Sequence, residues 1–135
     1  MSQTSDSATE TGVATGTFNA TSVLVVEDEA LVALDLEDML LDIGFKDVVL
    51  CNSIEAAEIT LSDRSFSYMV FDLNLDGKSS VPLIEKVLGS DVRIVVASGY
   101  DAKSVELPDP SIPRITKPYR FAELQQALFR NDTDI

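Results

Sequence analysis

The chain has 135 residues, a length that supports one domain with a hydrophobic core. Its 10 Lys and Arg face 23 Asp and Glu, and the net charge of −13 disfavours binding to nucleic acid or to an anionic membrane. The absence of histidine removes the commonest metal ligand and general base. No signal peptide or long apolar span is present, and the single cysteine, Cys51, is interpreted as a buried strand residue. We therefore expect a cytoplasmic monomer.

Residues 1–21 are rich in Ser, Thr, Ala and Gly and have almost no periodic apolar residues, which predicts a disordered tail. After residue 22, short apolar runs alternate with helical patterns. These runs are continuously apolar, as is typical of strands covered on both faces of a parallel sheet. The predicted strands are 22–28, 48–51, 67–72, 93–98 and 113–117.

Helical patterns fill the segments between the strands. The first should stop at Gly44, and Ser53 is the expected N-cap of the second. The third has Pro82 in its first turn and Gly89 just past its end. The apolar residues that indicate the first helix are Leu31, Leu34, Met39 and Leu41.

The segment 101–113 departs from this regularity because Pro108, Pro110 and Pro113 leave room for at most two helical turns. The fourth helix should therefore be short or irregular. A last amphipathic helix covers residues 120–129. The alternation of strands and helices predicts an α/β fold with a doubly wound, five-stranded parallel sheet and helices on both faces.

Chemically active side chains stand where the predicted strands end, the edge at which such sheets bind ligands. They are Glu27, Asp28, Glu29, Asp72, Ser98 and Lys117. Each alone is explained equally well as a polar residue entering a solvated loop. Together, carboxylates from neighbouring strand ends repel each other and favour a hard divalent cation among them, and Mg²⁺ suits a site that handles phosphoryl groups. An aspartate at such a site can accept a phosphoryl group.

Four short motifs, in this order and each at a strand end, resemble the receiver domain of bacterial two-component response regulators. They are "ED" at 27–28, "DLNLDG" from Asp72, "AS" at 97–98 and "KP" at 117–118. The resemblance covers residues 22–130 and leaves 131–135 as a C-terminal tail. It implies a flavodoxin-like sheet with strand order 2-1-3-4-5.

The resemblance also implies a role for each of these residues. Asp72 would be the phosphoacceptor, and Asp28, Asp72 and the backbone carbonyl of Asn74 would bind Mg²⁺, with Glu27 acting through water. Ser98 would hydrogen-bond the phosphoryl group and Lys117 would pair with it. Pro118 would follow a cis peptide bond.

The expected switch differs from the usual receiver pattern. Arg114 stands three residues before Lys117, where receivers usually carry an aromatic residue. Tyr100, after Ser98 and Gly99, supplies an aromatic side chain instead, as in a divergent branch whose fourth strand runs Phe-Ala-Thr-Gly followed by Gly or Tyr. We expect Ser98, Gly99, Tyr100 and Arg114 to form the switch.

The leading hypothesis is a single-domain response regulator, because only about five residues follow the last helix. It would accept phosphoryl from a histidine kinase or phosphotransfer protein and then contact a downstream protein, pass the group on or drain it. One alternative is an unphosphorylated interaction module. A phosphatase with an aspartyl nucleophile is disfavoured, because Asn74 stands where a haloacid-dehalogenase-like enzyme needs a second aspartate. We therefore expect no enzyme activity beyond slow self-dephosphorylation.

Overall fold

The computed structural model describes residues 22–89, 91–99 and 105–129. The predicted tails at 1–21 and 131–135 lie outside this part of the chain. Five parallel strands form one sheet in the order β2-β1-β3-β6-β7, which confirms the expected 2-1-3-4-5 arrangement once the strands of a small separate hairpin are set aside. The five are β1 (Ser22–Val26), β2 (Asp47–Cys51), β3 (Tyr68–Asp72), β6 (Arg93–Ser98) and β7 (Arg114–Thr116).

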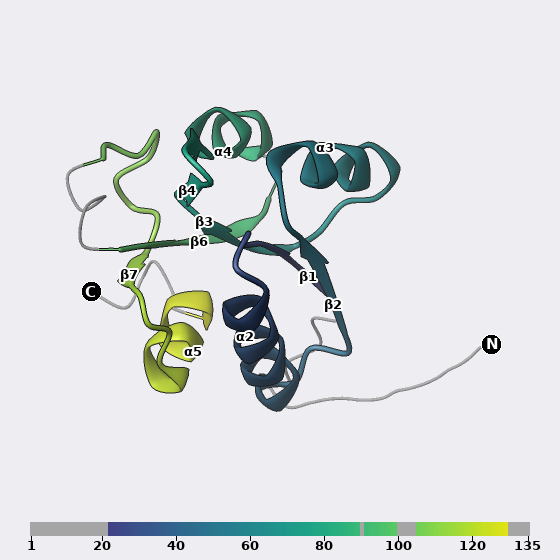
Figure 1. Ribbon diagram of the computed structural model, residues 1–135, viewed down its shortest axis with the longest axis vertical. Helices are drawn as coiled ribbons and strands as arrows, with labels where there is room; N and C mark the ends of the chain where they lie inside the picture. Colours follow the sequence, from purple (N-terminus) through teal and green to yellow (C-terminus); the bar gives the residue numbers. More distant parts are fainter. Residues whose placement is uncertain (1–21, 90, 100–104, 130–135) are drawn as a thin grey trace.

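Helices cover both faces of the sheet (Figure 1). The helices α3 (Ile54–Asp63) and α4 (Val81–Val87) lie on one face, and α2 (Ala30–Ile43) and α5 (Phe121–Phe129) lie on the other. Successive strand residues point to opposite faces, so Leu24 and Val26 pack in the core under α3 and α4. Val23 and Val25 pack in the core under α2 and α5. Two buried layers explain why the strands are continuously apolar.

The helix ends follow local sequence signals. Ser53 caps α3, and its Oγ accepts a hydrogen bond of 3.0 Å from Ala56 N. Gly44 ends α2 with φ of 131°, a conformation that glycine adopts without the steric cost of a Cβ. Pro82 lies in the first turn of α4, and Gly89, with φ of 85°, follows the helix end. The predicted ends of these helices are confirmed.

The buried face of α2 differs from the apolar pattern by which the helix was identified. Leu31 is 79% exposed and Leu34 is 51% exposed. The helix instead buries Ala33, Leu36 and Leu40. Its leucines offer two stripes with helical spacing, and the side that contacts the sheet is the one that carries the small Ala33.

Two connections also bear on the predictions. Residues 105–113 contain no helix, and 101–104 lie outside the described residues. A short antiparallel hairpin that was not predicted, β4 (Asn74–Leu75) with β5 (Lys78–Ser79), follows β3. Its turn is formed by Asp76 and Gly77, with φ of 53° and 85°.

Candidate functional site

Backbone hydrogen bonds beyond the strand ends hold the predicted residues at one edge of the sheet. Glu27 N donates to Cys51 O at 3.0 Å, and Lys117 N donates to Ser98 O at 2.9 Å. The register places Asp72 beside Ala97, one residue before Ser98. The strands β1, β3, β6 and β7 therefore each deliver a polar side chain to the same edge.

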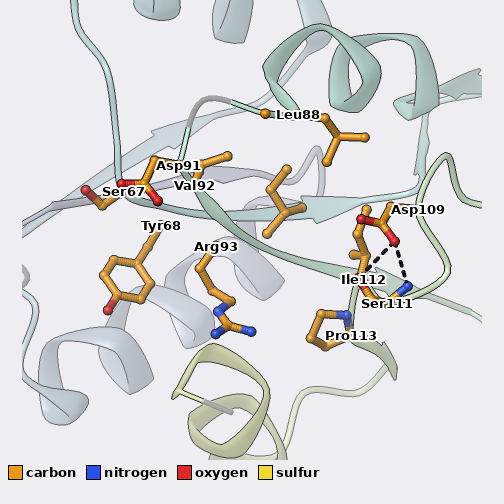
Figure 2. A pocket seen from close by; sticks show the side chains of 12 residues that line it. Ser67, Tyr68, Leu88, Asp91, Val92, Arg93, Asp109, Ser111, Ile112 and Pro113 are labelled. Atoms are coloured by element: carbon orange, nitrogen blue, oxygen red, sulfur yellow. Dashed lines mark hydrogen bonds between the residues drawn. The ribbon is translucent and has the colours of Figure 1, made fainter. Parts of the chain in front are cut away.

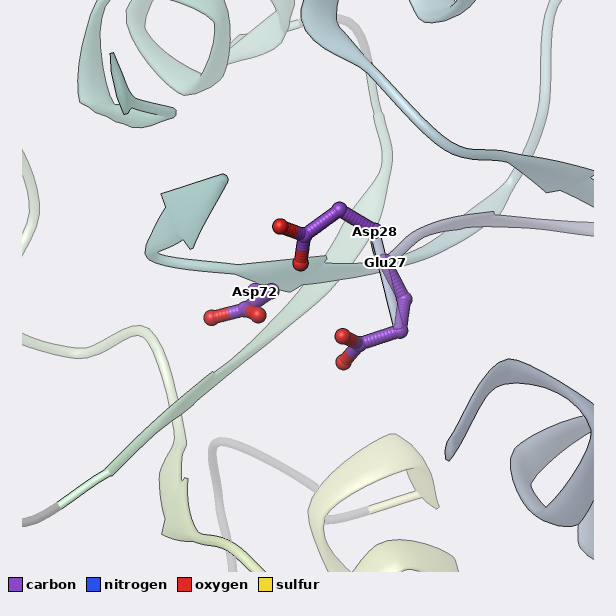
Figure 3. Close-up of side chains that lie close together, drawn as sticks. All are labelled: Glu27, Asp28 and Asp72. Atoms are coloured by element: carbon purple, nitrogen blue, oxygen red, sulfur yellow. The ribbon is translucent and has the colours of Figure 1, made fainter. Parts of the chain in front are cut away.

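Three carboxylates from two adjacent strand ends converge (Figure 3). Glu27, Asp28 and Asp72 each offer an oxygen that lies within 4.8 Å of the others. Glu27 is 2% exposed and Asp72 is 5% exposed, so water screens their repulsion poorly. Oxygen ligands at this spacing are the donor set that hard divalent cations prefer, and the residues fit such an ion.

Lys117 supplies the positive charge of the site. Its Nζ lies 3.0 Å from Asp72 Oδ2, 3.1 Å from Glu27 Oε1 and 3.3 Å from Glu29 Oε1. Burial alone would lower the pKa of Lys117, but the hydrogen bond and charge of Asp72, followed by those of Glu27, raise it above its usual value. The ammonium group is therefore held charged next to Asp72.

The surroundings of Glu27 act on its pKa in opposite directions. Burial, the largest cause, and repulsion from Asp72 outweigh the opposing contacts, so that the pKa of Glu27 is raised to about 7. The backbone N–H of Glu29, 3.1 Å from Glu27 Oε2, and the charge of Lys117 act in the opposite direction. A single ammonium group thus only partly compensates several carboxylates, and a metal ion would complete the compensation.

The loop after β3 fixes the orientation of Asp72. Asn74 N donates to Asp72 Oδ1 at 3.1 Å, while Asn74 Oδ1 accepts from Gly77 N at 2.9 Å within the hairpin turn. Leu73 N donates to Ala97 O at 2.9 Å and ties the loop to β6. Asn74 therefore lies beside Asp72, and its role as a backbone ligand for a metal stays a prediction.

The predicted switch residues are only partly described. Ser98 is 1% exposed, and its Oγ has no hydrogen-bond partner in the described part of the chain. Gly99 is exposed, and Tyr100 lies outside the described residues. Arg114 is half-buried in β7 and donates a hydrogen bond to the carbonyl of Val105. The hydroxyl of Ser98 thus lies at the site edge with its bonding capacity free, while the switch itself stays a prediction.

Tyr119 belongs to the site and was not predicted. Burial, followed by the charges of Glu27 and Asp72, raises the pKa of its hydroxyl well above the usual value. It follows the peptide bond between Lys117 and Pro118, which is cis as the motif "KP" implied. The only sequence signal for a role of Tyr119 in the site is its position two residues after Lys117. An aromatic residue that simply packs in the core would account for that position equally well.

Cys51 has a structural explanation. It is buried at the end of β2, as expected, with its Sγ 3.5 Å from Thr60 Oγ1.

Within residues 22–89, 91–99 and 105–129, no helix has the length and apolar character needed to cross a membrane.

Comparison with known proteins gives a consistent group of relatives. No protein-family model matches the chain. The chain is 28% identical, over 96% of its length, to the phyllosphere-induced regulator PhyR of Methylorubrum extorquens AM1, and it spans about half, 51%, of that regulator.

Solved structures match the described fold. SdrG from Sphingomonas melonis Fr1 is 30% identical, with a TM-score of 0.72 over 81% of this chain and 93% of SdrG. The receiver (REC) domain of the response regulator PhyR from Erythrobacter litoralis is 26% identical, with a TM-score of 0.69 over 86% of this chain and 95% of that domain.

A response regulator from Burkholderia pseudomallei, solved with a phosphorylated aspartic acid, a calcium ion and citrate, is also 26% identical. Its TM-score is 0.71 over 82% of this chain and 68% of that one. The strand order of the sheet and the similarity to these proteins agree. The chain therefore belongs to the receiver domains of response regulators.

Proposed function

We propose that this receiver domain accepts a phosphoryl group on Asp72, with Mg²⁺ bound beside it. The observation that carries the proposal is the convergence on Asp72 of a half-buried ammonium group and two further carboxylates. A purely structural ion pair would need one acid for Lys117, whereas this edge of the sheet places Glu27, Asp28, Glu29 and Asp72 around or near it.

In the proposed reaction a carboxylate oxygen of Asp72 attacks the phosphorus atom of the donor. A new P–O bond forms, and the bond between phosphorus and the leaving group breaks, with its electron pair staying on the leaving group. Lys117 Nζ, 3.0 Å from Asp72 Oδ2, offsets negative charge on the phosphoryl oxygens. The hydroxyl of Ser98, which has no hydrogen-bond partner among the described residues, can donate to one of those oxygens.

The metal-binding part of the proposal involves Asp28, Asp72 and the backbone carbonyl of Asn74, with Glu27 acting through water. All are oxygen donors, and the buried Glu27 Oε1 has no hydrogen-bond partner among the described residues. The Burkholderia relative was solved with a calcium ion and a phosphorylated aspartic acid, which supports a divalent cation at this kind of site. When bound, Mg²⁺ would neutralise charge that develops on the phosphoryl oxygens.

A hollow of about 470 Å³ opens beside Asp28, and we infer that a phosphoryl donor approaches the site from this side. Its walls come from the start of α3 and from the β4–β5 hairpin, including Glu55, Asp76 and Lys78. This chain contains no histidine, so a phosphohistidine donor must belong to another molecule. We infer that the donor is a histidine kinase or a phosphotransfer protein, and that the output is a protein contact or onward transfer or loss of the phosphoryl group.

The test is incubation with Mg²⁺ and acetyl phosphate, followed by intact-mass measurement. We expect wild type to gain the mass of one phosphoryl group and Asp72→Asn to gain none, because the amide lacks the nucleophilic carboxylate. Asp76→Asn is the matched control, since it neutralises an exposed acid in the same loop and asparagine tolerates the φ of 53° found there.

Two results would contradict the proposal. Full uptake by Asp72→Asn would place the phosphoacceptor elsewhere. No uptake by folded wild type from acetyl phosphate or from a phosphorylated histidine protein would favour the unphosphorylated interaction module instead.

A further inference from the structure

Tyr119 connects the acidic site to the core beneath it. The residue is 8% exposed, and its ring belongs to the apolar cluster between the sheet and α5, which includes Leu124 and Leu128. Its hydroxyl lies at the other end of the ring, where Glu27 and Asp72 act on it electrostatically. The side chain therefore spans from the helix-covered face of the sheet to the site.

Two oxygens at this place have unused bonding capacity. The hydroxyl of Tyr119 and Oε1 of Glu27 are both buried, and neither has a hydrogen-bond partner in the described part of the chain. Lys117 Nζ lies 3.1 Å from Glu27 Oε1, but the two make an ion pair without hydrogen-bond geometry. Buried polar atoms are normally paired, and Glu27 is among the groups that act on the Tyr119 hydroxyl, so these two unpaired atoms are candidates for each other.

The chemistry of the pair fixes its direction. In its ionised form the Glu27 carboxylate can only accept, and its Oε2 already accepts from Glu29 N at 3.1 Å and from Lys117 Nζ at 3.3 Å, which leaves Oε1 as the acceptor for the phenol. Hydrogen bonds to an ionised acceptor are stronger than neutral ones.

We propose that the hydroxyl of Tyr119 donates to Glu27 Oε1 and holds that carboxylate in the orientation used by Lys117 and the metal. Tyr119 is then a positioning residue that acts through Glu27 and does not touch the phosphoryl group. Because the same ring packs in the cluster with residues of α5, this hydrogen bond also connects the site to that helix. The inference rests on the proposed phosphoacceptor function for its effect on rate, but the hydrogen bond itself can be tested separately.

The first measurement is the initial rate of phosphoryl uptake from acetyl phosphate in Mg²⁺. Tyr119→Phe keeps the packed ring and removes only the hydroxyl, and we expect its rate to fall roughly fivefold, the effect of about one hydrogen bond. Tyr68→Phe is the matched control, because Tyr68 packs in the same core at the opposite end of β3. Its rate should equal that of wild type, and an unchanged rate for Tyr119→Phe would overturn the positioning role.

The second measurement is a double-mutant cycle on the free energy of unfolding in urea, with Glu27→Met as the partner variant. We expect the effect of Tyr119→Phe to disappear when Glu27 is already replaced, whereas Tyr68→Phe should have the same effect in both backgrounds. Equal effects of Tyr119→Phe in both backgrounds would show that the two side chains are not coupled and would overturn the inference. If wild type takes up no phosphoryl group, the proposed function fails, and this cycle still decides whether the hydrogen bond exists.

Discussion

The two ends of the parallel sheet differ in the kind of side chain that they bury. At the amino end, the rings of Phe45, Tyr68 and Phe129 pack together, with centroids 5.2 Å apart for Phe45 and Tyr68 and 5.7 Å apart for Tyr68 and Phe129. At the carboxyl end, Glu27 and Asp72 are buried as acids beside Lys117. Aromatic packing stabilises a fold directly, whereas buried like charges cost free energy unless something binds them.

The amino end also has a hollow, and its polar groups are arranged differently (Figure 2). It measures about 700 Å³ and lies between the starts of β3 and β6, the loop after α4 and residues 109–113. There Asp109 accepts hydrogen bonds from the backbone N and the Oγ of its neighbour Ser111. The hydrogen bonds between Asp109 and Ser111 stay within one turn, whereas the charged side chains at the carboxyl end converge on Asp72. Convergence of buried charge distinguishes the site better than the size of a hollow does.

The largest expected effect comes from breaking the aromatic cluster. Phe45→Ala should lower the free energy of unfolding by about 3–5 kcal/mol, because it removes a ring that is 2% exposed and leaves a cavity. Urea unfolding measures the change. The folded variant should still take up phosphoryl at the wild-type rate, since the ring is at the opposite end of the sheet from Asp72. A rate that falls in parallel with stability would show that the two ends are not independent.

Leu31→Ala is the control for that prediction and also tests the buried face of α2. Leu31 is 79% exposed, so the expected change in the free energy of unfolding is below about 0.5 kcal/mol. A loss comparable to that of Phe45→Ala would restore the sequence interpretation, in which Leu31 marked the apolar side of the helix.

The central strands β1, β3 and β6 could be predicted because each is buried on both faces and is therefore apolar along nearly all of its length. The orientation of α2 could not, because its leucines form two stripes with helical spacing, and only contact with the sheet selects the one with Leu36 and Leu40. The β4–β5 hairpin was missed because each strand has only two residues, too few for any alternation to be visible.

The site could be predicted in large part because strand order fixes which strand ends are neighbours. Asp72 and Lys117 meet at 3.0 Å although 45 residues separate them in the sequence. Tyr119 was missed because its role depends on which atoms surround its hydroxyl, and a sequence records only an aromatic residue. The direct contact between Glu29 and Lys117 is likewise a product of loop geometry.

An effect of intermediate size is expected from binding Mg²⁺ at the carboxyl end. At ten times the Kd, mass action should raise the free energy of unfolding by about 1.4 kcal/mol, because the ion binds carboxylates that are gathered only in the folded state. Urea unfolding in MgCl₂, compared with NaCl of equal ionic strength, separates this gain from general screening. Asp28→Asn should lose the gain, and an equal gain in that variant would place the ion elsewhere.

A small effect on stability together with a large effect on phosphoryl uptake is expected at Ser98. Its hydroxyl is buried and has no partner among residues 22–89, 91–99 and 105–129, so we expect Ser98→Ala to change the free energy of unfolding by less than about 1 kcal/mol, in the stabilising direction if at all. Phosphoryl uptake should nevertheless fall by at least about tenfold, because one donor to the phosphoryl oxygens is lost. Ser80→Ala is the matched control, since Ser80 is also fully buried, has a hydroxyl without a partner within the described part of the chain, and lies at the start of α4. It should leave both stability and uptake near wild type.

A loss of more than about 2 kcal/mol in the free energy of unfolding of Ser98→Ala would mean that the hydroxyl has a structural partner. An unchanged uptake rate would remove Ser98 from the site, so the two measurements together decide whether this buried hydroxyl serves the fold or the reaction.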